Sequence, residues 1–179
     1  PVYFIRVLRD YGPEFTAEQE GKTWLNYAAE EHGMYWWGGF GRSTEHTAYL
    51  RLKQCIPSPR SGSIDLNGPI VAEQIGAQIF IDAFGMVAPG DPKLAARLAE
   101  RAGRVSHDGE AVNGAKVVAA MVSAAFVEKD MGKLLDVGVS VIPSDSCIAQ
   151  VHRDVRAWAA QDGDWHKTYA RIAEKYREI

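Results

Sequence analysis

The most informative stretch of the chain is Ser61-Gly62-Ser63-Ile64-Asp65-Leu66-Asn67-Gly68-Pro69, a polar turn between apolar segments of helical spacing. Two more polar, glycine-containing turns follow, Ala88-Pro89-Gly90-Asp91-Pro92 and Val105-Ser106-His107-Asp108-Gly109. Each turn places polar groups where a helix is expected to begin. Such a layout is typical of a ligand-binding helical domain.

Apolar residues recur at helical spacing along nearly the whole chain, and no convincing run of alternating β-branched residues occurs. The sequence therefore predicts an all-α fold, and the absence of repeats and linkers predicts one domain over residues 1–179. The expected helices are 2–11, 16–33, 45–54, 67–86, 92–102 and 110–128, then three more that begin at Asp130, Ser144 and Asp164. The helix over 110–128 is rich in Ala and Val and is expected to be central. In the last helix, Trp165, Tyr169, Ile172 and Tyr176 are expected to face inward.

Composition excludes several classes of function. The net charge is −3 and basic residues alternate with acidic ones, which argues against a partner that is a nucleic acid or an anionic membrane. No apolar run is long enough to cross a bilayer. Cys55 and Cys147 lack the spacing of a zinc site or a disulfide scaffold, so we expect buried free thiols and a cytoplasmic setting. Because the sequence starts at Pro1, within an expected helix, we interpret it as a piece of a longer protein.

The turn from Ser61 to Pro69 allows two interpretations. Its hydroxyls, its side-chain amide and the backbone N–H groups of a helix start suit a phosphate or another anion. The alternative is a capped helix after a tight loop, which the residues alone favour. His107 also allows two interpretations, because its imidazole could face a diphosphate or could bond to a neighbouring carbonyl group, and a lone histidine is more often structural.

Two further groups of residues could line a cleft. Gln74, Gln78 and Asp82 share one face of an expected helix. This face either lines a polar cleft or is exposed to solvent. An aromatic, glycine-rich loop precedes them and could stack on a flat ring or fill the core beneath it. Its residues are Trp36, Trp37 and Phe40, followed by Arg42, Glu45 and His46, whose roles stay open.

Three blocks of sequence carry a resemblance to a known family. They are Trp36-Trp37-Gly38-Gly39-Phe40-Gly41-Arg42-Ser43-Thr44-Glu45-His46-Thr47-Ala48, Ser61-Gly62-Ser63 with Asn67-Gly68, and Val105-Ser106-His107-Asp108-Gly109. With these blocks the chain resembles the ADP-ribosylglycohydrolase family from near Pro1 to near Tyr176. The resemblance implies a compact orthogonal helix bundle that hydrolyses the glycosidic bond between ADP-ribose and an acceptor, using a pair of magnesium ions.

The resemblance also implies site residues. The loop before the Asn-Gly helix start would wrap the ADP-ribose, which assigns Gly62, Ser63, Asn67 and Gly68 to substrate binding. His107 would lie near the diphosphate. No catalytic residue is assigned, and the aromatic loop would flank the cleft.

The acidic metal ligands of the family are not matched by any stretch of this sequence. We therefore expect an incomplete bundle that holds no magnesium alone and is not active unaided, since magnesium needs a near-octahedral set of oxygen ligands. The alternatives are an inactive ADP-ribose-binding module and a purely structural helical module. Exposed apolar surface on the central helices predicts self-association, or association with further segments.

Overall fold

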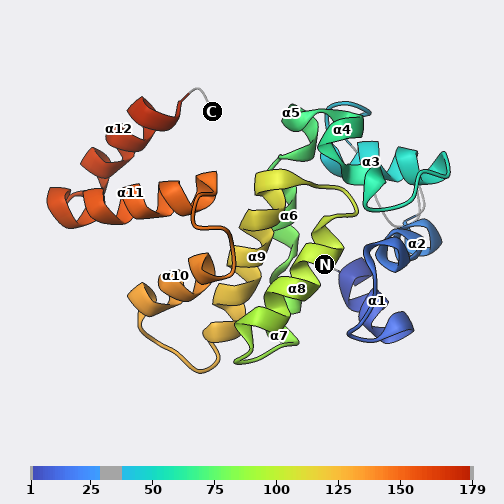
Figure 1. Cartoon of the computed structure of the whole chain (residues 1–179), viewed down its shortest axis with the longest axis horizontal. Helices are drawn as coiled ribbons and strands as arrows, with labels where there is room; N and C mark the ends of the chain where they lie inside the picture. Colours follow the sequence, from blue (N-terminus) through green and yellow to red (C-terminus); the bar gives the residue numbers. More distant parts are fainter. Residues whose placement is uncertain (1, 29–37, 178–179) are drawn as a thin grey trace.

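The computed structural model describes residues 2–28 and 38–177, which form α-helices joined by turns and one short 3₁₀ helix (Figure 1). Within these residues there is no β-strand, so the predicted all-α fold is confirmed. The elements are α1 (Val2–Tyr11), α2 (Ala17–Tyr27), α3 (Thr44–Lys53), η1 (Arg60–Gly62), α4 (Ile64–Asn67), α5 (Pro69–Ala72), α6 (Gly76–Phe80), α7 (Asp82–Met86), α8 (Pro92–Gly103), α9 (Gly109–Ala124), α10 (Met131–Ser140), α11 (Cys147–Asp162) and α12 (Trp165–Tyr176). Trp36 and Trp37 of the aromatic loop lie outside the described residues.

Helix α9 is the centre of the arrangement, as predicted, and it packs against α6, α7, α8, α10 and α11. Small residues allow the close approach. A Cβ atom added to Gly85 of α7 would lie 2.6 Å from Val122 Cβ, and one added to Gly138 of α10 would lie 2.7 Å from Met121 Cγ. The helix ends at Ala124, four residues before the predicted end.

Several predicted helix starts are confirmed in detail. Thr16 accepts a hydrogen bond from the Gln19 N–H and the Gln19 side chain accepts one from the Thr16 N–H, which completes the expected capping box of α2. Asp91, Asp130 and Asp164 cap α8, α10 and α12 through their side chains. Ser144 is not a cap, because α11 begins two residues later behind the side chain of Ser146.

The continuous helix expected over 67–86 is wrong: this stretch contains the end of α4 and then α5, α6 and α7. Gly68, at φ +79°, turns the chain between α4 and α5. Near α6, the Ala77 N–H donates to the His107 ring, whereas a continuous helix would direct it to the carbonyl group of Glu73. A contact with a distant residue therefore overrides the local helical pattern.

The apolar core lies between α1, α2, α7, α8 and α9. Its largest fully buried apolar side chains include Phe15, Ile81, Phe84 and Leu98. The same interior contains the carboxyl group of Glu20, which accepts a hydrogen bond from the Trp24 indole N–H. Burial raises the pKa of Glu20 to about 8, so this carboxyl group is protonated at neutral pH.

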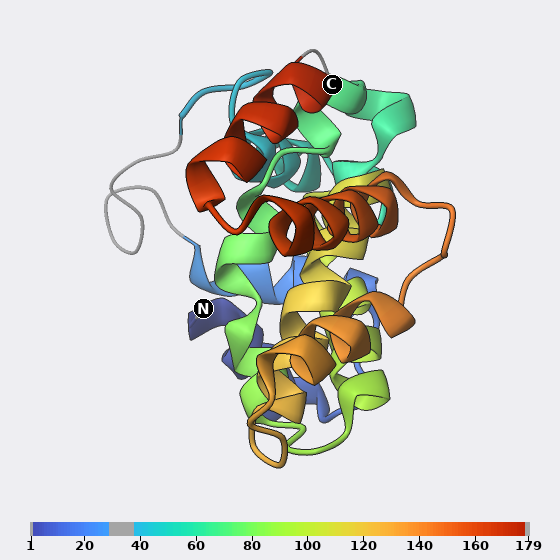
Figure 2. The ribbon, with the colours of Figure 1, turned by 90° about the vertical axis from the view of Figure 1, so that its left-hand side faces the viewer.

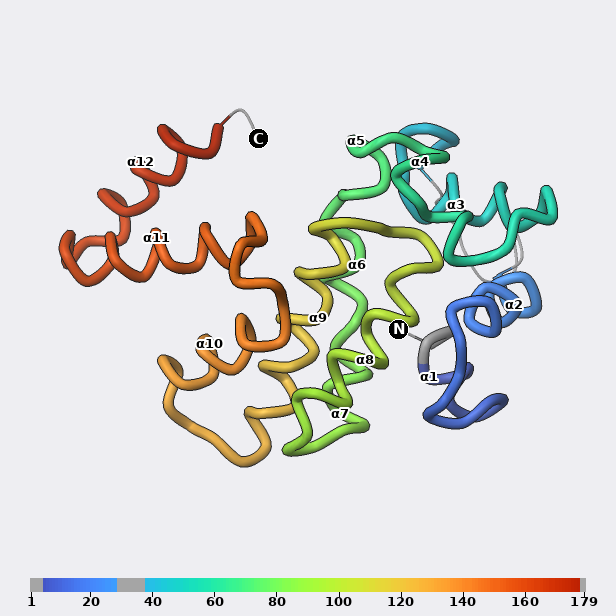
Figure 3. The backbone as a smooth tube through the Cα atoms, viewed as in Figure 1, coloured from blue at the N-terminus to red at the C-terminus, as the bar shows by residue number. Residues whose placement is uncertain are grey.

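Helices α11 and α12 form a hairpin on one side of the other helices (Figures 1 and 2). The tube view shows that α12 is connected to the rest of the chain only through α11 (Figure 3), and α12 packs chiefly against α11. The expectation that Trp165 and Tyr169 face inward is wrong, since both side chains are exposed. The expectation of buried thiols is also wrong, because Cys55 is exposed and Cys147 is only half-buried. Each described helix is too short or too polar to span a lipid bilayer.

Candidate functional site

Two polar turns that are distant in sequence meet at one corner of the structure. The first is the segment 57–68, with η1 and α4, and the second is the segment 103–109, between α8 and α9. Ser61 Oγ donates to the Val105 carbonyl oxygen at 2.7 Å, and Ser58 Oγ donates to the Arg104 carbonyl oxygen at 3.2 Å. We call these two segments the polar corner.

Gly62 lies where the two turns are in closest contact. A Cβ atom at this position would lie 2.4 Å from the carbonyl carbon of Ser106 and 2.7 Å from the backbone nitrogen of His107. Both neighbours are backbone atoms that no side-chain rotation can move aside. The requirement for glycine at position 62 is therefore a packing requirement between the turns.

His107 is buried behind the turn that contains it. Its Nε2 accepts a hydrogen bond from the Ala77 N–H at 3.1 Å, which leaves the proton on Nδ1, where it is donated to Ser106 Oγ at 2.7 Å. Burial lowers the pKa of His107 to about 3, so the ring is neutral. Its nearest carboxylate is that of Glu45, with Oε1 3.9 Å from Nε2. Both ring nitrogens thus have protein partners.

Asp108 connects the two turns through its carboxylate. Oδ2 accepts from the Ile64 N–H at the start of α4, and Oδ1 accepts from the Gly109 N–H at the start of α9. The next N–H of α9, that of Glu110, donates to Glu73 Oε1 at 2.7 Å. These helix starts therefore already have anionic partners within the protein.

Asn67 holds the first turn from within. Its Nδ2 donates to the Ser61 carbonyl oxygen at 2.7 Å, and its Oδ1 accepts from Arg51 Nε at 3.2 Å. Gly68 follows at a positive φ and precedes Pro69 in the first turn of α5, as predicted. Ser63 Oγ donates to the Arg60 carbonyl oxygen at 3.0 Å.

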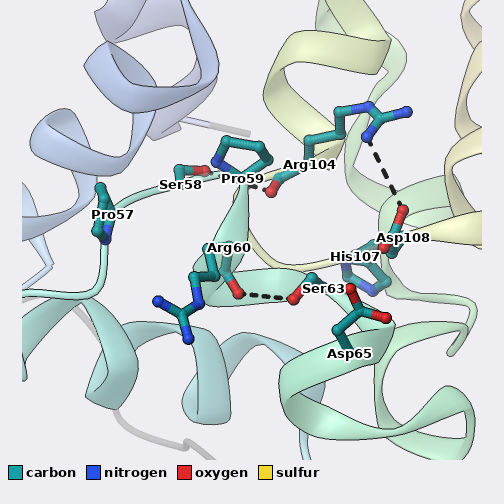
Figure 4. A pocket seen from close by; sticks show the side chains of 9 residues that line it. All are labelled: Pro57, Ser58, Pro59, Arg60, Ser63, Asp65, Arg104, His107 and Asp108. Atoms are coloured by element: carbon teal, nitrogen blue, oxygen red, sulfur yellow. Dashed lines mark hydrogen bonds and ion pairs between the residues drawn. The ribbon is translucent and has the colours of Figure 1, made fainter.

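A cavity of about 420 Å³ opens at the polar corner (Figure 4). This volume is in the usual range of small-molecule sites. The residues that line it come from both turns: Pro57, Ser58, Pro59, Arg60, Ser63, Asp65, Arg104, His107 and Asp108. Of the five predicted binding residues, Ser63 and His107 line the cavity, whereas Gly62, Asn67 and Gly68 shape the turn beside it.

Two arginines on the cavity wall were not singled out from the sequence. Arg104 lies 3.4 Å from Glu100 and 3.9 Å from Asp108, and Arg60 forms no ion pair with any other described residue. Figure 4 shows the two side chains extending in different directions from the wall. Each arginine directly precedes a turn that the sequence did single out, and this position is the signal that could have identified them.

The other candidate residues lie beside this corner. The His46 ring accepts a hydrogen bond from the Gly39 N–H at 3.0 Å. Phe40 is exposed, with the Arg51 guanidinium group 4.8 Å from its ring centre. Gln74 donates to the carbonyl oxygen of Arg42. The bond between Gln74 and Arg42 therefore joins the loop to the turn between α5 and α6, and neither residue lines the cavity.

The described residues do not fit a magnesium ion. Across 2–28 and 38–177, no three His, Cys, Asp or Glu side chains are grouped so that they could hold a metal. Of the two carboxylates at the cavity, that of Asp108 is already bonded to two backbone N–H groups. Magnesium prefers several oxygen ligands in near-octahedral geometry, which this wall does not supply.

Comparisons with known proteins give one match. The sequence model of the ADP-ribosylglycohydrolase family matches residues 4–178, which is nearly the whole chain. A search of the curated proteins and a search of the solved structures gave no match.

Proposed function

The chain belongs to the ADP-ribosylglycohydrolase family, and we propose that it binds the ADP-ribose part of an ADP-ribosylated substrate in the cavity at the polar corner. The family implies a hydrolase that acts on such substrates. The observation that carries the proposal is the position of Arg60 and Arg104 on the wall of a cavity of about 420 Å³.

The chemistry of the wall suits a diphosphate. A guanidinium group donates several hydrogen bonds in a planar arrangement that matches phosphate oxygens. Arg60 has no carboxylate partner among the described residues, so it is available for a ligand without first breaking an ion pair. The hydroxyl group of Ser63 lies on the same wall and can rotate toward a ligand oxygen.

The remaining predicted residues are proposed to position this wall. Asn67 bonds to the Ser61 carbonyl oxygen, and Gly62 allows the first turn to rest on the second. His107 supports the second turn through Ala77 and Ser106. We therefore assign Gly62, Asn67, Gly68 and His107 to the shape of the site and Ser63, Arg60 and Arg104 to contact with the ligand.

The family to which the chain belongs implies a hydrolase. The described side chains do not fit the magnesium ion with which the family would activate water. The same observation favours a second candidate function, an ADP-ribose-binding module that does not turn its ligand over.

Isothermal titration calorimetry with ADP-ribose tests the proposed binding. The wild-type chain should give a saturable isotherm, and Arg60→Gln and Arg104→Gln should each weaken binding about 10-fold, because each removes a charge-assisted hydrogen bond. Arg97→Gln on α8 is the matched control, since Arg97 is an exposed arginine outside the cavity. No saturation at millimolar ADP-ribose would reject the proposal.

Two further variants test the positioning residues. His107→Ala and Asn67→Ala should each weaken ADP-ribose binding, because each releases one turn of the wall. Circular dichroism should verify that each variant is folded. Unchanged affinity in both would show that their hydrogen bonds do not shape the site.

Release of ADP-ribose from an ADP-ribosylated peptide separates the two candidate functions. The family activity predicts release when magnesium is added to the purified chain, whereas the binding module predicts saturable binding without release. A chain that binds and does not release supports the second candidate.

A further inference from the structure

A second cavity, of about 280 Å³, lies between α8, α9 and the end of α10. Both α8 and α10 pack against α9, which lies between them in Figure 1. The polar residues that line the cavity are Lys93, Arg97 and Glu100 of α8, Lys116 of α9 and Ser140 at the end of α10. None of them lines the cavity at the polar corner. We call this second cavity the basic cavity.

The wall of the basic cavity carries an excess of positive charge. Lys93, Arg97 and Lys116 are cations, whereas Glu100 is the one carboxylate among the lining residues. The carbonyl groups at the end of α10 add a partial negative charge of about half an elementary charge. This partial charge is smaller than the excess of three cations over one carboxylate. A negative ligand is therefore attracted to the cavity.

The carboxylate of Glu100 does not neutralise the cations of α8 at this wall. Its Oε1 lies 3.4 Å from Arg104 Nε, and its Oε2 lies 3.6 Å from Lys116 Nζ. Each carboxylate oxygen therefore already has a cationic partner. Lys93 and Arg97 are left without a carboxylate of their own.

Lys93 and Arg97 are four residues apart on α8, so their side chains project from the same face of the helix. Both are exposed, and neither forms an ion pair with another described residue. Like charges at this spacing repel each other and destabilise a helix. An anion held between the two side chains would replace this repulsion with two attractions.

The size and the charge of the basic cavity select the kind of ligand. Its volume is below the usual range of sites for whole small molecules, which begins at about 300 Å³, so it suits one small anion. Three cations against one carboxylate match a doubly charged ion, and the guanidinium group of Arg97 can donate to two phosphate oxygens at once. ADP-ribose does not meet this requirement, because each of its phosphate groups is esterified on two sides and carries one charge.

From these observations we infer that the basic cavity binds a phosphate dianion, which is either free inorganic phosphate or the phosphate group of a monoester. Lys93 and Arg97 supply the donors that have no partner in the protein, and Lys116 adds a positive charge from α9. The inference does not depend on the proposed ADP-ribose binding, because the two cavities share no lining residue.

Titration of the isotopically labelled chain with inorganic phosphate, followed by two-dimensional NMR, tests the inference. At about pH 8 phosphate is doubly charged. The wild-type chain should show saturable shifts of the amide signals of residues 93–100 and 116, with half-saturation in the millimolar range. Sodium chloride at the same ionic strength is the blank, because it screens charges without forming bidentate hydrogen bonds.

Two variants test the residues that carry the inference. Lys93→Gln and Arg97→Gln should each raise the dissociation constant for phosphate about 10-fold, because each removes a positive charge from the wall. The matched control is Lys167→Gln on α12, since Lys167 is an exposed lysine that lines neither cavity. All three side chains are exposed, so each variant should retain the fold, which circular dichroism verifies.

Three results would overturn the inference. The first is a set of shifts that does not saturate or that sodium chloride reproduces. The second is a set of shifts confined to residues 57–68, which would place the phosphate at the polar corner. The third is an unchanged dissociation constant in both Lys93→Gln and Arg97→Gln.

A parallel titration with O-phosphoserine identifies the source of the dianion. We expect weaker binding than that of inorganic phosphate, because the volume of the cavity suits a small ion, and this result would assign free phosphate as the ligand. Tighter binding of O-phosphoserine would assign the phosphate group of a larger molecule.

Discussion

The polar corner and the α11–α12 hairpin are held by different kinds of contact. At the corner, segments more than forty residues apart are joined by hydrogen bonds that the Ser58 and Ser61 hydroxyl groups donate and that the Asp108 carboxylate accepts. In the hairpin, the contacts of α12 are chiefly with α11, its neighbour in sequence, and the side chains of Trp165 and Tyr169 are exposed.

Because of this difference in contacts, we expect the two regions to differ in local stability. A corner that is closed by buried polar groups has one arrangement, because any displacement leaves a buried donor or acceptor without a partner. A hairpin with few long-range contacts can separate locally at a low free-energy cost. We therefore expect a preformed cavity at the corner and a hairpin that opens more readily than the rest of the fold.

Substitution of Gly62 should have the largest effect. Gly62→Ala places a methyl group 2.4 Å from the Ser106 backbone, so the turns must separate, and we expect unfolding free energy to fall by about 3 kcal/mol. Urea unfolding followed by circular dichroism measures this. The control is Gly103→Ala, where the added atom meets its nearest neighbours at 3.9 Å and the stability should be unchanged or higher. Equal stability of both variants would contradict the close packing of the corner.

Acidification should selectively destabilise the corner. The folded-state pKa of His107 is lowered by burial from 6.5 to about 3. Below pH 6.5 the unfolded chain therefore binds a proton that the folded chain does not, and stability is lost as the pH falls toward 3. From neutral pH to about pH 5 this residue should account for a loss of about 2 kcal/mol.

The pH dependence of urea unfolding in wild type and His107→Gln measures this contribution. The variant should lack that part of the acid dependence. His166→Gln in the hairpin is the control and should retain it, because the His166 side chain is exposed to solvent in the folded chain. A wild-type acid dependence in His107→Gln would contradict a buried, neutral imidazole.

Two aspartate caps allow a direct comparison of the regions. Asp108 accepts hydrogen bonds from both turns of the corner, whereas Asp164 accepts only within its own helix start. Asp108→Ala should lower the unfolding free energy by about 2 kcal/mol and Asp164→Ala by about 0.5 kcal/mol. Thermal unfolding of the two variants under the same conditions gives the ranking, and the reverse order would refute the comparison.

Truncation of an exposed hairpin residue should have the smallest effect on the unfolding free energy. Trp165→Ala should change the unfolding free energy by less than about 0.5 kcal/mol, because its side chain is 71% exposed. Chemical unfolding of wild type and variant in dilute solution measures this difference. A large loss of stability would mean that the Trp165 side chain packs against the other helices.

The sequence predicted those parts of the fold that are determined by residues close together in the chain. Thr16 with Gln19, and the aspartates before α8, α10 and α12, define helix starts through side chains only two or three residues away. The Ala-rich pattern of α9 also predicted its central place correctly.

The sequence could not predict features that depend on distant contacts. The break between α5 and α6 arises where Ala77 bonds to His107, thirty positions further along the chain. Exposure of Trp165 and Tyr169 was missed because an amphipathic pattern identifies an apolar face without showing what covers it. Arg60 and Arg104 share a cavity only because the turns that follow them pack together.

Hydrogen exchange with and without saturating ADP-ribose tests the central claim most directly, because it follows both regions in one experiment. If the cavity at the polar corner binds the ligand, exchange should slow in peptides that cover residues 57–68 and 103–110 and should stay unchanged across α11 and α12. Unchanged exchange at the corner, or protection confined to the hairpin, under conditions where calorimetry shows saturation would contradict it.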